Sequence, residues 1–399
     1  MNKSWREVLR ECLALAMPYG TERIDRRASG NRVLAEDIVS DRDYPSGNLS
    51  MMDGYAVGAE RRESYDVVGE NTPGTGIGRS LAQGTARRIF TGAELPSGAA
   101  RIVPQENVHR EGNRISITEW PDTDFVRPRG REAKEGDVVL AKGTKIGPVE
   151  RAILATVGRR EVEVLGAPSI ARIATGDEII PPDQQLPEGK IRDSNGDLIE
   201  ELLLSCNAHA AATSYCPDDP KVVFSVVETL TKSSDILLIS GGASVGDHDH
   251  ALPALKAAGF TVLAHGLHVK PGRPVAIARR EEKWAFALPG NPLSHLIVLR
   301  LLVTPILRAC CGETNVEPQL LRGVLEGELK KEIPRRDTFW PASVSVRDGK
   351  LHARAGRFLS SGDLIGTAGI NGFISLPTGQ PVPAVGDAVD ILPLSPTFP

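Results

Sequence analysis

The chain has 399 residues, 41% of them hydrophobic and 25% charged, which is the composition of a globular protein with roughly two to four domains. Its formal net charge of −4, without a long basic run, argues against nucleic acid as a general partner. The N-terminal residues lack the apolar core of a signal peptide, and the longest apolar segment, 293–307, is too short to span a bilayer. We therefore expect a cytoplasmic protein that does not bind a membrane. Five cysteines without a Cys-x-x-Cys spacing predict reduced core thiols.

The first half of the chain predicts one helix followed by a β-rich module. Apolar residues recur at three- and four-residue spacing from Trp5 to Ala16, which indicates an amphipathic helix that ends near Pro18. Residues 66–119 read as short strands separated by turns. Residues 125–143 are basic and rich in glycine, which favours a linker over a rim that faces an anion.

A second pattern begins after a predicted helix at 149–157, because strands and helices alternate from residue 169 onward. Three of the predicted strands end in a polar turn rich in glycine or proline, and a helix follows each of them. Such turns collect at the carboxyl edge of a doubly wound parallel sheet, so this edge is the candidate active site. The predicted strands are 169–175, 235–239, 262–269 and 284–288, and the predicted helices are 195–205, 222–230, 251–258 and 293–309.

The turn after the second of these strands carries the strongest chemical signal. Gly241, Gly242 and Gly246 leave backbone N–H groups free to approach a ligand, and Ser240 and Ser244 add hydroxyls that can bind phosphate oxygens. Acids then follow at 247 and 249, so the loop suits a phosphorylated ligand with a divalent cation. The competing interpretation is an ordinary strand-loop junction with solvated acids. The chain has neither a Gly-x-Gly-x-x-Gly dinucleotide motif nor a P-loop.

After residue 317 the helical pattern disappears, and short strands predict a separate β module. The segments 342–346 and 351–354 flank Asp348-Gly349, which is a strong hairpin signal. Residues 373–376 and 388–392 are further expected strands.

Seven motifs in this order resemble the molybdopterin molybdotransferases, the family of MoeA and the gephyrin E domain. Each motif is weak alone, but together they cover nearly the whole chain. They are Met52-Asp53-Gly54-Tyr55-Ala56, Thr91-Gly92-Ala93, Thr175-Gly176-Asp177-Glu178, Asp193-Ser194-Asn195, residues 240–246, Lys270-Pro271-Gly272 and residues 288–292.

The resemblance implies a multidomain α/β fold in four parts. These are an N-terminal helical domain (1–49 and 135–165), a β-rich insertion (50–134), an αβα pterin-binding domain (166–316) and a C-terminal β domain (317–399). It also implies a homodimer with shared active sites and a contact with the molybdopterin adenylyltransferase. The implied reaction inserts molybdate into adenylylated molybdopterin and releases AMP, with Mg²⁺ as the cation. Whether the inserted metal is molybdenum or tungsten stays open.

The resemblance also gives roles to individual residues. The catalytic residues it implies are Asp53, Thr91, Glu178, Asp249, Lys270 and Arg273, and the carboxylates that would hold the cation are Asp249, Glu178 and Asp247. Lys270 and Arg273 supply positive charge for molybdate or phosphate. The substrate-binding set is Asp193, Ser194, Asn195, Asp218, Gly241, Gly242, Ser244, Pro289, Pro292 and Ser361.

Several positions depart from the family pattern. Gly266 and Pro341 stand where basic residues are common, Arg273 replaces a lysine, and Glu132 replaces an aspartate. These departures motivate a second hypothesis, a catalytically reduced pterin-binding or scaffold protein on the same fold. A third is the smaller adenylyltransferase that shares the αβα domain, but the additional modules at 50–130 and 320–399 argue against it.

Overall fold

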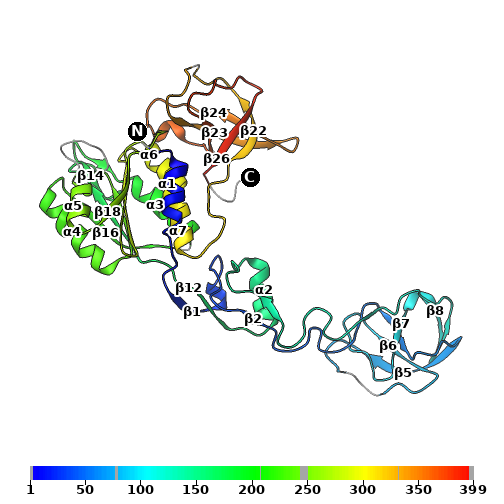
Figure 1. The fold of residues 1–399 in the computed structure, drawn as a ribbon. Coiled ribbons are helices and arrows are strands. Elements are labelled where there is room, and N and C mark those ends of the chain that lie inside the picture. Colours follow the sequence, from blue (N-terminus) through cyan, green and yellow to red (C-terminus); the bar gives the residue numbers. More distant parts are fainter. Residues whose placement is uncertain (1–2, 77–79, 207, 243–249, 331, 395–399) are drawn as a thin grey trace. The chain divides into compact units, whose positions relative to one another are not determined.

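The computed structural model describes residues 3–76, 80–206, 208–242, 250–330 and 332–394, and the chain divides into two compact units (Figure 1). Unit 1 consists of Met1–Arg23, Asn31–Val33 and Glu163–Pro399, and unit 2 consists of Ile24–Gly30 and Leu34–Val162. The strands β1 (Thr21–Asp25) and β12 (Glu161–Leu165) lie where the chain passes from one unit to the other.

Unit 1 contains a six-stranded sheet with the order β16-β13-β17-β21-β20-β18. The strands β16, β13, β17 and β21 are parallel, whereas β20 and β18 run antiparallel at one edge. The sheet is therefore mixed, and it includes β16, a strand that the sequence patterns did not predict. The bounds are β13 Ile170–Thr175, β16 Ala210–Cys216, β17 Ile236–Ser240, β18 Thr261–His265, β20 Ala276–Arg280 and β21 Lys283–Leu288.

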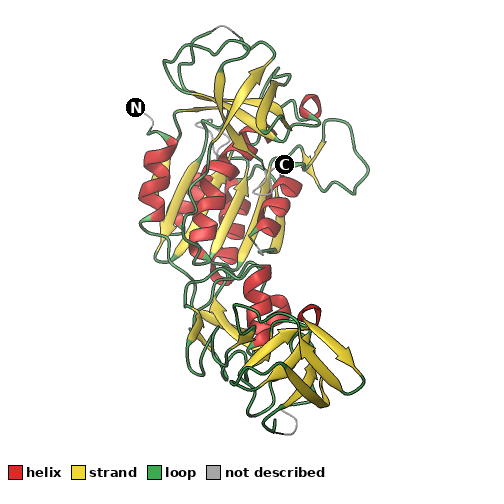
Figure 2. Cartoon of the chain, turned by 90° about the vertical axis from the view of Figure 1, so that its right-hand side faces the viewer, coloured by secondary structure: helices red, strands yellow, loops and turns green. Residues whose placement is uncertain are grey.

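Helices cover both faces of this sheet (Figure 2), which explains the uninterrupted apolar run of β17. Ile236 and Leu238 belong to a core with α1, α3, α6 and α7, and Leu237 and Ile239 belong to a second core with α4 and α5. This arrangement confirms the predicted αβα architecture. The helices are α1 Trp5–Leu13, α3 Asn195–Ser205, α4 Pro220–Ser233, α5 Ala251–Ala257, α6 Pro292–Val298 and α7 Thr304–Cys310, with a π-helical turn at Leu299–Val303.

The opening helix begins at a capping box, in which the hydroxyl of Ser4 accepts a hydrogen bond from the Glu7 N–H and the Glu7 carboxylate accepts one from the Ser4 N–H. It ends at Leu13, earlier than the predicted stop near Pro18.

The helix predicted at 293–309 is confirmed, but the expectation that its apolar segment is too short to span a bilayer was wrong. Helical structure is continuous from Pro292 to Cys310, and these 19 residues are long and apolar enough to cross a membrane by length and composition. However, 78% of its most apolar stretch is buried inside the protein, so it is a core helix of unit 1. Arg300 is a charged residue within this apolar helix. Its Nε donates to the Pro393 carbonyl at 3.1 Å, so its side chain lies against the last strand of the chain.

The C-terminal strands of unit 1 form a second six-stranded sheet with the order β19-β23-β24-β22-β26-β25, and β25 also pairs with β23, which closes a barrel. Asp348 and Gly349 have φ values of 50° and 70°, as the predicted hairpin requires. The predicted strand at 262–269 was wrong as one element, because it breaks at Gly266 and its second part joins this sheet as β19. The bounds are β19 Val269–Lys270, β22 Leu321–Glu326, β23 Asp337–Arg347, β24 Lys350–Ala355, β25 Gly372–Leu376 and β26 Ala388–Pro393, with a 3₁₀ turn at Ile365–Thr367.

Unit 2 contains a six-stranded sheet with the order β7-β4-β6-β5-β9-β8, as the short strands of its sequence predicted. The basic segment 125–143 is more ordered than a linker, because β10 and β11 pair antiparallel with β3 and β2. The remaining elements are β2 Ile38–Val39, β3 Leu49–Ser50, β4 Gly54–Val57, β5 Ser64–Asn71, β6 Thr85–Ile89, β7 Arg101–Pro104, β8 Val108–Glu111, β9 Arg114–Ile117, β10 Val126–Arg127, β11 Val138–Leu140, α2 Pro148–Thr156 and 3₁₀ turns at Arg26–Ala28 and Gln105–Asn107.

Candidate functional site

The carboxyl ends of the adjacent strands β13, β17 and β21 open into a cavity of about 310 Å³, which we call cavity A. The strands end at Thr175, Ser240 and Leu288, and the turns that follow them supply most of the lining. Cavity A therefore lies at the edge that the turn pattern indicated. Residues of the predicted site that line it are Glu178, Asp193, Asn195, Asp218, Gly241, Gly242 and Pro289.

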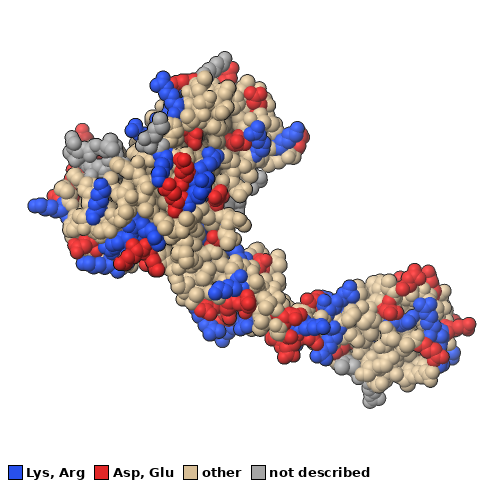
Figure 3. Space-filling model, in the orientation of Figure 1, with Lys and Arg blue, Asp and Glu red and all other residues tan. Residues whose placement is uncertain are grey.

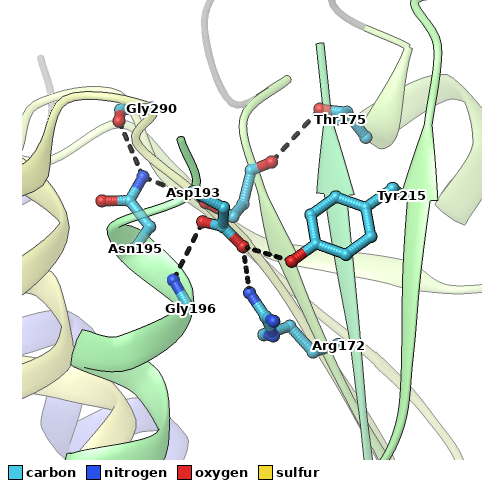
Figure 4. A network of polar contacts seen from close by, with 8 residues as sticks. Arg172, Thr175, Asp193, Asn195, Gly196, Tyr215 and Gly290 are labelled. Carbon is cyan, nitrogen blue, oxygen red and sulfur yellow. Dashed lines mark hydrogen bonds and ion pairs between the residues drawn. The ribbon is translucent and has the colours of Figure 1, made fainter. Parts of the chain in front are cut away.

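Asn195, the first residue of α3, joins two of these turns (Figure 4). Its Nδ2 donates to the Ser240 hydroxyl at 3.1 Å and to the Gly290 carbonyl at 2.7 Å. Asn195 is only 8% exposed, and its Oδ1 has no hydrogen-bond partner in the part of the chain that the structure describes. The side chain thus links α3 to the ends of β17 and β21. Ser194 precedes it at the N-cap position without a capping hydrogen bond from its side chain.

Asp193 lines the cavity and is also one half of a buried ion pair with Arg172 of β13. Its carboxylate also accepts hydrogen bonds from the Tyr215 hydroxyl at 3.3 Å and from the Gly196 N–H at 2.9 Å (Figure 4). Both oxygens are therefore engaged within the protein, and they tie the start of α3 to the sheet. Sequence reasoning missed Arg172 and Tyr215, although a charge inside an apolar strand was a signal for the first.

The glycine turn after β17 lies close against the end of β13. Gly241 has a φ of +92°, and a Cβ atom there would lie 2.6 Å from the Thr175 Oγ1 and 2.9 Å from the Thr175 carbonyl oxygen. Only glycine fits this position without strain. Of the other residues that the sequence assigned to this loop, Ser244, Asp247 and Asp249 lie outside the described residues.

The described carboxylates of cavity A are sparse. Glu178 is exposed and Asp218 is half-buried, and the Asp218 N–H donates to the Asp177 carboxylate at 3.1 Å. Within the described ranges no three His, Cys, Asp or Glu side chains converge as a metal site. Mg²⁺ commonly uses one or two carboxylates together with substrate phosphates, so Glu178 and Asp218 fit the partial ligand set that this cation needs.

The proline loop after β21 is anchored from below by His295, which sequence reasoning passed over. The Nδ1 of His295 donates to the Pro289 carbonyl at 2.9 Å, and the imidazole is fully buried. Burial lowers the pKa of His295 to about 4, so the ring is neutral at neutral pH. Pro292 follows as the first residue of α6.

A second cavity of about 500 Å³, cavity B, adjoins cavity A, because Pro274 and Asn291 line both. Lys270, Arg273 and Ser361, three residues of the predicted site, line cavity B. The Asn291 Nδ2 donates to the Ser361 hydroxyl at 2.9 Å and so connects the proline loop to the barrel. Lys330, Arg336, Trp340 and Ser360 also line it, and none of these four was predicted.

Unit 2 brings together the two remaining predicted residues, Asp53 and Thr91. The Asp53 carboxylate accepts hydrogen bonds from the N–H and the hydroxyl of Thr91, each at 2.8 Å. These bonds, first the one from the backbone, lower the pKa of Asp53, and the charge of Arg88 acts in the same direction. The carboxylate is therefore ionised and fixed in orientation at neutral pH.

The charges on the surface are mixed in sign. On the face shown in Figure 3, Lys and Arg side chains are interspersed with Asp and Glu side chains over both units.

The fold and its cavities define a multidomain α/β protein with a polar cavity at the carboxyl edge of its central sheet, next to a pocket lined by basic side chains. Residues 3–158 match the family described as "MoeA N-terminal region (domain I and II)", and residues 171–309 match the "Probable molybdopterin binding domain". A molybdopterin molybdenumtransferase of Staphylococcus aureus (strain Mu50) is 31% identical over 386 residues, covering 94% of this chain and 91% of the relative. One of Nostoc sp. (strain PCC 7120) is 33% identical over 389 residues, covering 94% and 89%.

The crystal structure of a molybdopterin biosynthesis MoeA protein from Pyrococcus horikoshii OT3 superposes with a TM-score of 0.82 at 28% identity, covering 98% of this chain and all of the other. The chain belongs to the molybdopterin molybdenumtransferase family of MoeA proteins. It is a transferase of molybdenum cofactor biosynthesis, which confirms the resemblance in its sequence. The comparisons do not favour the scaffold alternative.

Proposed function

We propose that cavity A holds the phosphate groups of adenylylated molybdopterin, that cavity B holds molybdate, and that this juxtaposition serves the transfer of molybdenum with release of AMP. The observation that carries the proposal is the shared lining of the two cavities by Pro274 and Asn291. One cavity has glycine N–H groups, hydroxyls and an amide, and the other has basic side chains.

In cavity A, the Gly242 N–H is the backbone donor that we assign to phosphate oxygens, and the Ser240 hydroxyl lies in the same lining. The Gly241 N–H, which the sequence suggested as a second donor, instead donates to the Leu288 carbonyl at 3.1 Å. Asn195 fixes the relative position of the glycine turn and the proline loop, so the site is organised before the ligand binds. In cavity B, Lys270 and Arg273 attract the oxyanion and orient it toward the neighbouring site. Ser194, Pro292 and Ser361 complete the set that we assign to substrate binding.

The finer cofactor assignment is part of the same proposal. Mg²⁺ would neutralise charge on the pyrophosphate, and the carboxylates of Glu178, Asp247 and Asp249 would bind the cation. We also propose that the protein acts in the cytoplasm, contacts the adenylyltransferase that supplies its substrate, and has the four-domain division expected from its sequence.

Two variants separate the roles of the two cavities. Glu178→Gln should lower AMP release even at saturating molybdate, because it alters cavity A. Lys270→Met should mainly raise the KM for molybdate, because it removes charge from cavity B. Lys350→Met, an exposed residue of the β24 hairpin, is the control and should leave both constants unchanged. A Lys270→Met enzyme with weaker pterin binding and an unaltered molybdate KM would contradict the assignment of the cavities.

We further propose a homodimer in which Asp53 and Thr91 of one subunit complete the site of its partner. Asp53→Ala and Glu178→Ala proteins should each be inactive. Mixed by unfolding and refolding them together, they should recover about a quarter of wild-type activity, because half of the dimers then have one intact site. No recovery, although mixed dimers are isolated, would mean that each site is built from one subunit.

A further inference from the structure

The lining of cavity B holds more positive charge than the sequence motifs predicted. Four basic side chains line it. Lys270 is the last residue of β19, and Arg273 lies in the turn that follows this strand. The other two are Lys330, which lies between β22 and β23, and Arg336, which precedes β23. The basic residues therefore reach the cavity from separate segments of the chain.

None of these four cations is joined to an acid by an ion pair among the described residues. No Asp or Glu in those ranges lines cavity B. Elsewhere in the same sheet, Arg322 pairs with Asp390 at 2.7 Å and Arg347 pairs with Glu326 at 2.5 Å. Glu332 lines an adjoining pocket of about 200 Å³ together with Lys270, Lys330 and Arg336, so that pocket holds three of the same cations and one acid. Gathered like charges favour an anionic occupant.

Arg336 is held in place beside Lys270. The strands β19 and β23 pair in parallel, with Val269 opposite Asp337 and Lys270 opposite Thr338. One N–H of the Arg336 guanidinium donates to the Val269 carbonyl at 3.3 Å, and the side chain is half-buried. A guanidinium has five N–H donors, so most of them stay available to a ligand.

Lys330 reaches the cavity from an anchored position. Leu329, its neighbour, is buried in the barrel core at 6% exposure, whereas Lys330 itself is exposed. The cavity wall near it includes Trp340, whose indole N–H donates to the Gly356 carbonyl at 2.9 Å and whose ring meets Phe358 edge-on at 5.4 Å. An ammonium at this wall supplies positive charge to a cavity that no described acid lines.

We propose that Lys330 and Arg336 are anion-binding residues of cavity B, which together with Lys270 and Arg273 hold a tetrahedral oxyanion dianion of the molybdate class. The inference rests on the proposed function, since that function assigns molybdate to this cavity. It also explains how the pocket keeps its charge although Gly266 and Pro341 are uncharged.

The test is equilibrium binding of molybdate to the full-length protein at low salt, without pterin, for Lys330→Met, Arg336→Gln and the double variant. Each single change removes a charge-assisted hydrogen bond, so each should weaken binding about ten-fold, and the double variant more. Arg322→Gln, whose guanidinium is already paired with Asp390, and Lys350→Met are charge-matched controls that should bind as the wild type does. Arg336→Lys should restore part of the affinity. Unchanged binding in the exposed Lys330→Met variant and in a folded Arg336→Gln variant would overturn the proposal.

Parallel titrations with tungstate, sulfate, phosphate and AMP identify the ligand class. The proposal expects molybdate and tungstate to bind more tightly than phosphate or AMP, and it is overturned if phosphate and AMP bind most tightly and depend on the same two residues. Steady-state kinetics of AMP release then distinguish the anion site of cavity B from the proposed transferase function. A raised molybdate KM with an unchanged kcat supports both. Loss of molybdate binding in the variants of a protein that never releases AMP would support the anion site and refute the proposed function.

Discussion

His295 gives a prediction about stability that can be worked from its surroundings. The imidazole is fully buried beneath the proline loop, its Nδ1–H is bonded to the Pro289 carbonyl, and its pKa is lowered to about 4 by burial. In the unfolded chain a histidine has a pKa of about 6.5. Between the folded-state and unfolded-state pKa values, His295 is protonated in the unfolded chain and neutral in the folded protein. The free energy of unfolding therefore falls as the pH falls from about 6.5 toward 4.

The size of the effect follows from the two pKa values. Between pH 7 and pH 5 this residue alone should cost about 2 kcal/mol of unfolding free energy. The two neighbouring charges act on the pKa of His295 in opposite directions, because Asp193 raises it and Arg172 lowers it. Burial is the largest cause of the shift.

Urea unfolding at pH 7 and pH 5, followed by tryptophan fluorescence, measures this loss. His295→Asn keeps a side-chain N–H near the position of Nδ1 but cannot titrate, so its stability should change by about 2 kcal/mol less between the two pH values. His265→Asn, at an exposed residue of β18, should follow the wild type. An identical pH dependence in wild type and His295→Asn would refute the reasoning.

Three further predictions concern the lining and the core of unit 1. Arg172→Met leaves the buried Asp193 carboxylate without its counterion and should destabilise the protein by about 3–5 kcal/mol in urea unfolding, whereas Arg172→Met with Asp193→Leu should recover much of this loss. Gly241→Ala should cost about 1–3 kcal/mol and weaken pterin binding in a fluorescence titration, because its Cβ would meet β13. Gly290→Ala is the control for stability and should leave it unchanged, because no atom of the described residues lies within 4 Å of the new Cβ. Burial raises the pKa of the Cys310 thiol to about 12, so it should resist iodoacetamide at pH 8 until the protein is unfolded, and rapid native labelling would contradict this.

The sequence predicted the αβα architecture because its signals were local. The apolar run at Ile236–Ile239 and the Asp348-Gly349 hairpin each depend on neighbouring residues. The strand at 262–269 was wrong because the pattern of apolar residues continues through Gly266, while the backbone turns there and enters another sheet. Periodicity does not say which sheet a strand joins.

The sequence predicted only those site residues that belong to its recognisable motifs. Lys330 and Arg336 lie more than fifty positions from Lys270 in the sequence, and only the pairing of β19 with β23 brings them to one cavity. His295 acts through a buried hydrogen bond to a carbonyl and Tyr215 through a part-buried hydrogen bond to a carboxylate, and such partners have no spacing rule. Residues that position others are therefore the ones that sequence reasoning passes over.

The most direct test of the account is AMP release by the full-length protein given adenylylated molybdopterin, Mg²⁺ and low molybdate, with Asp249→Ala alongside. The account predicts AMP release that depends on molybdate, saturates with it and is lost in the variant. Tight pterin binding with AMP release that does not respond to molybdate would contradict the claim that the two adjoining cavities act as one transferase site.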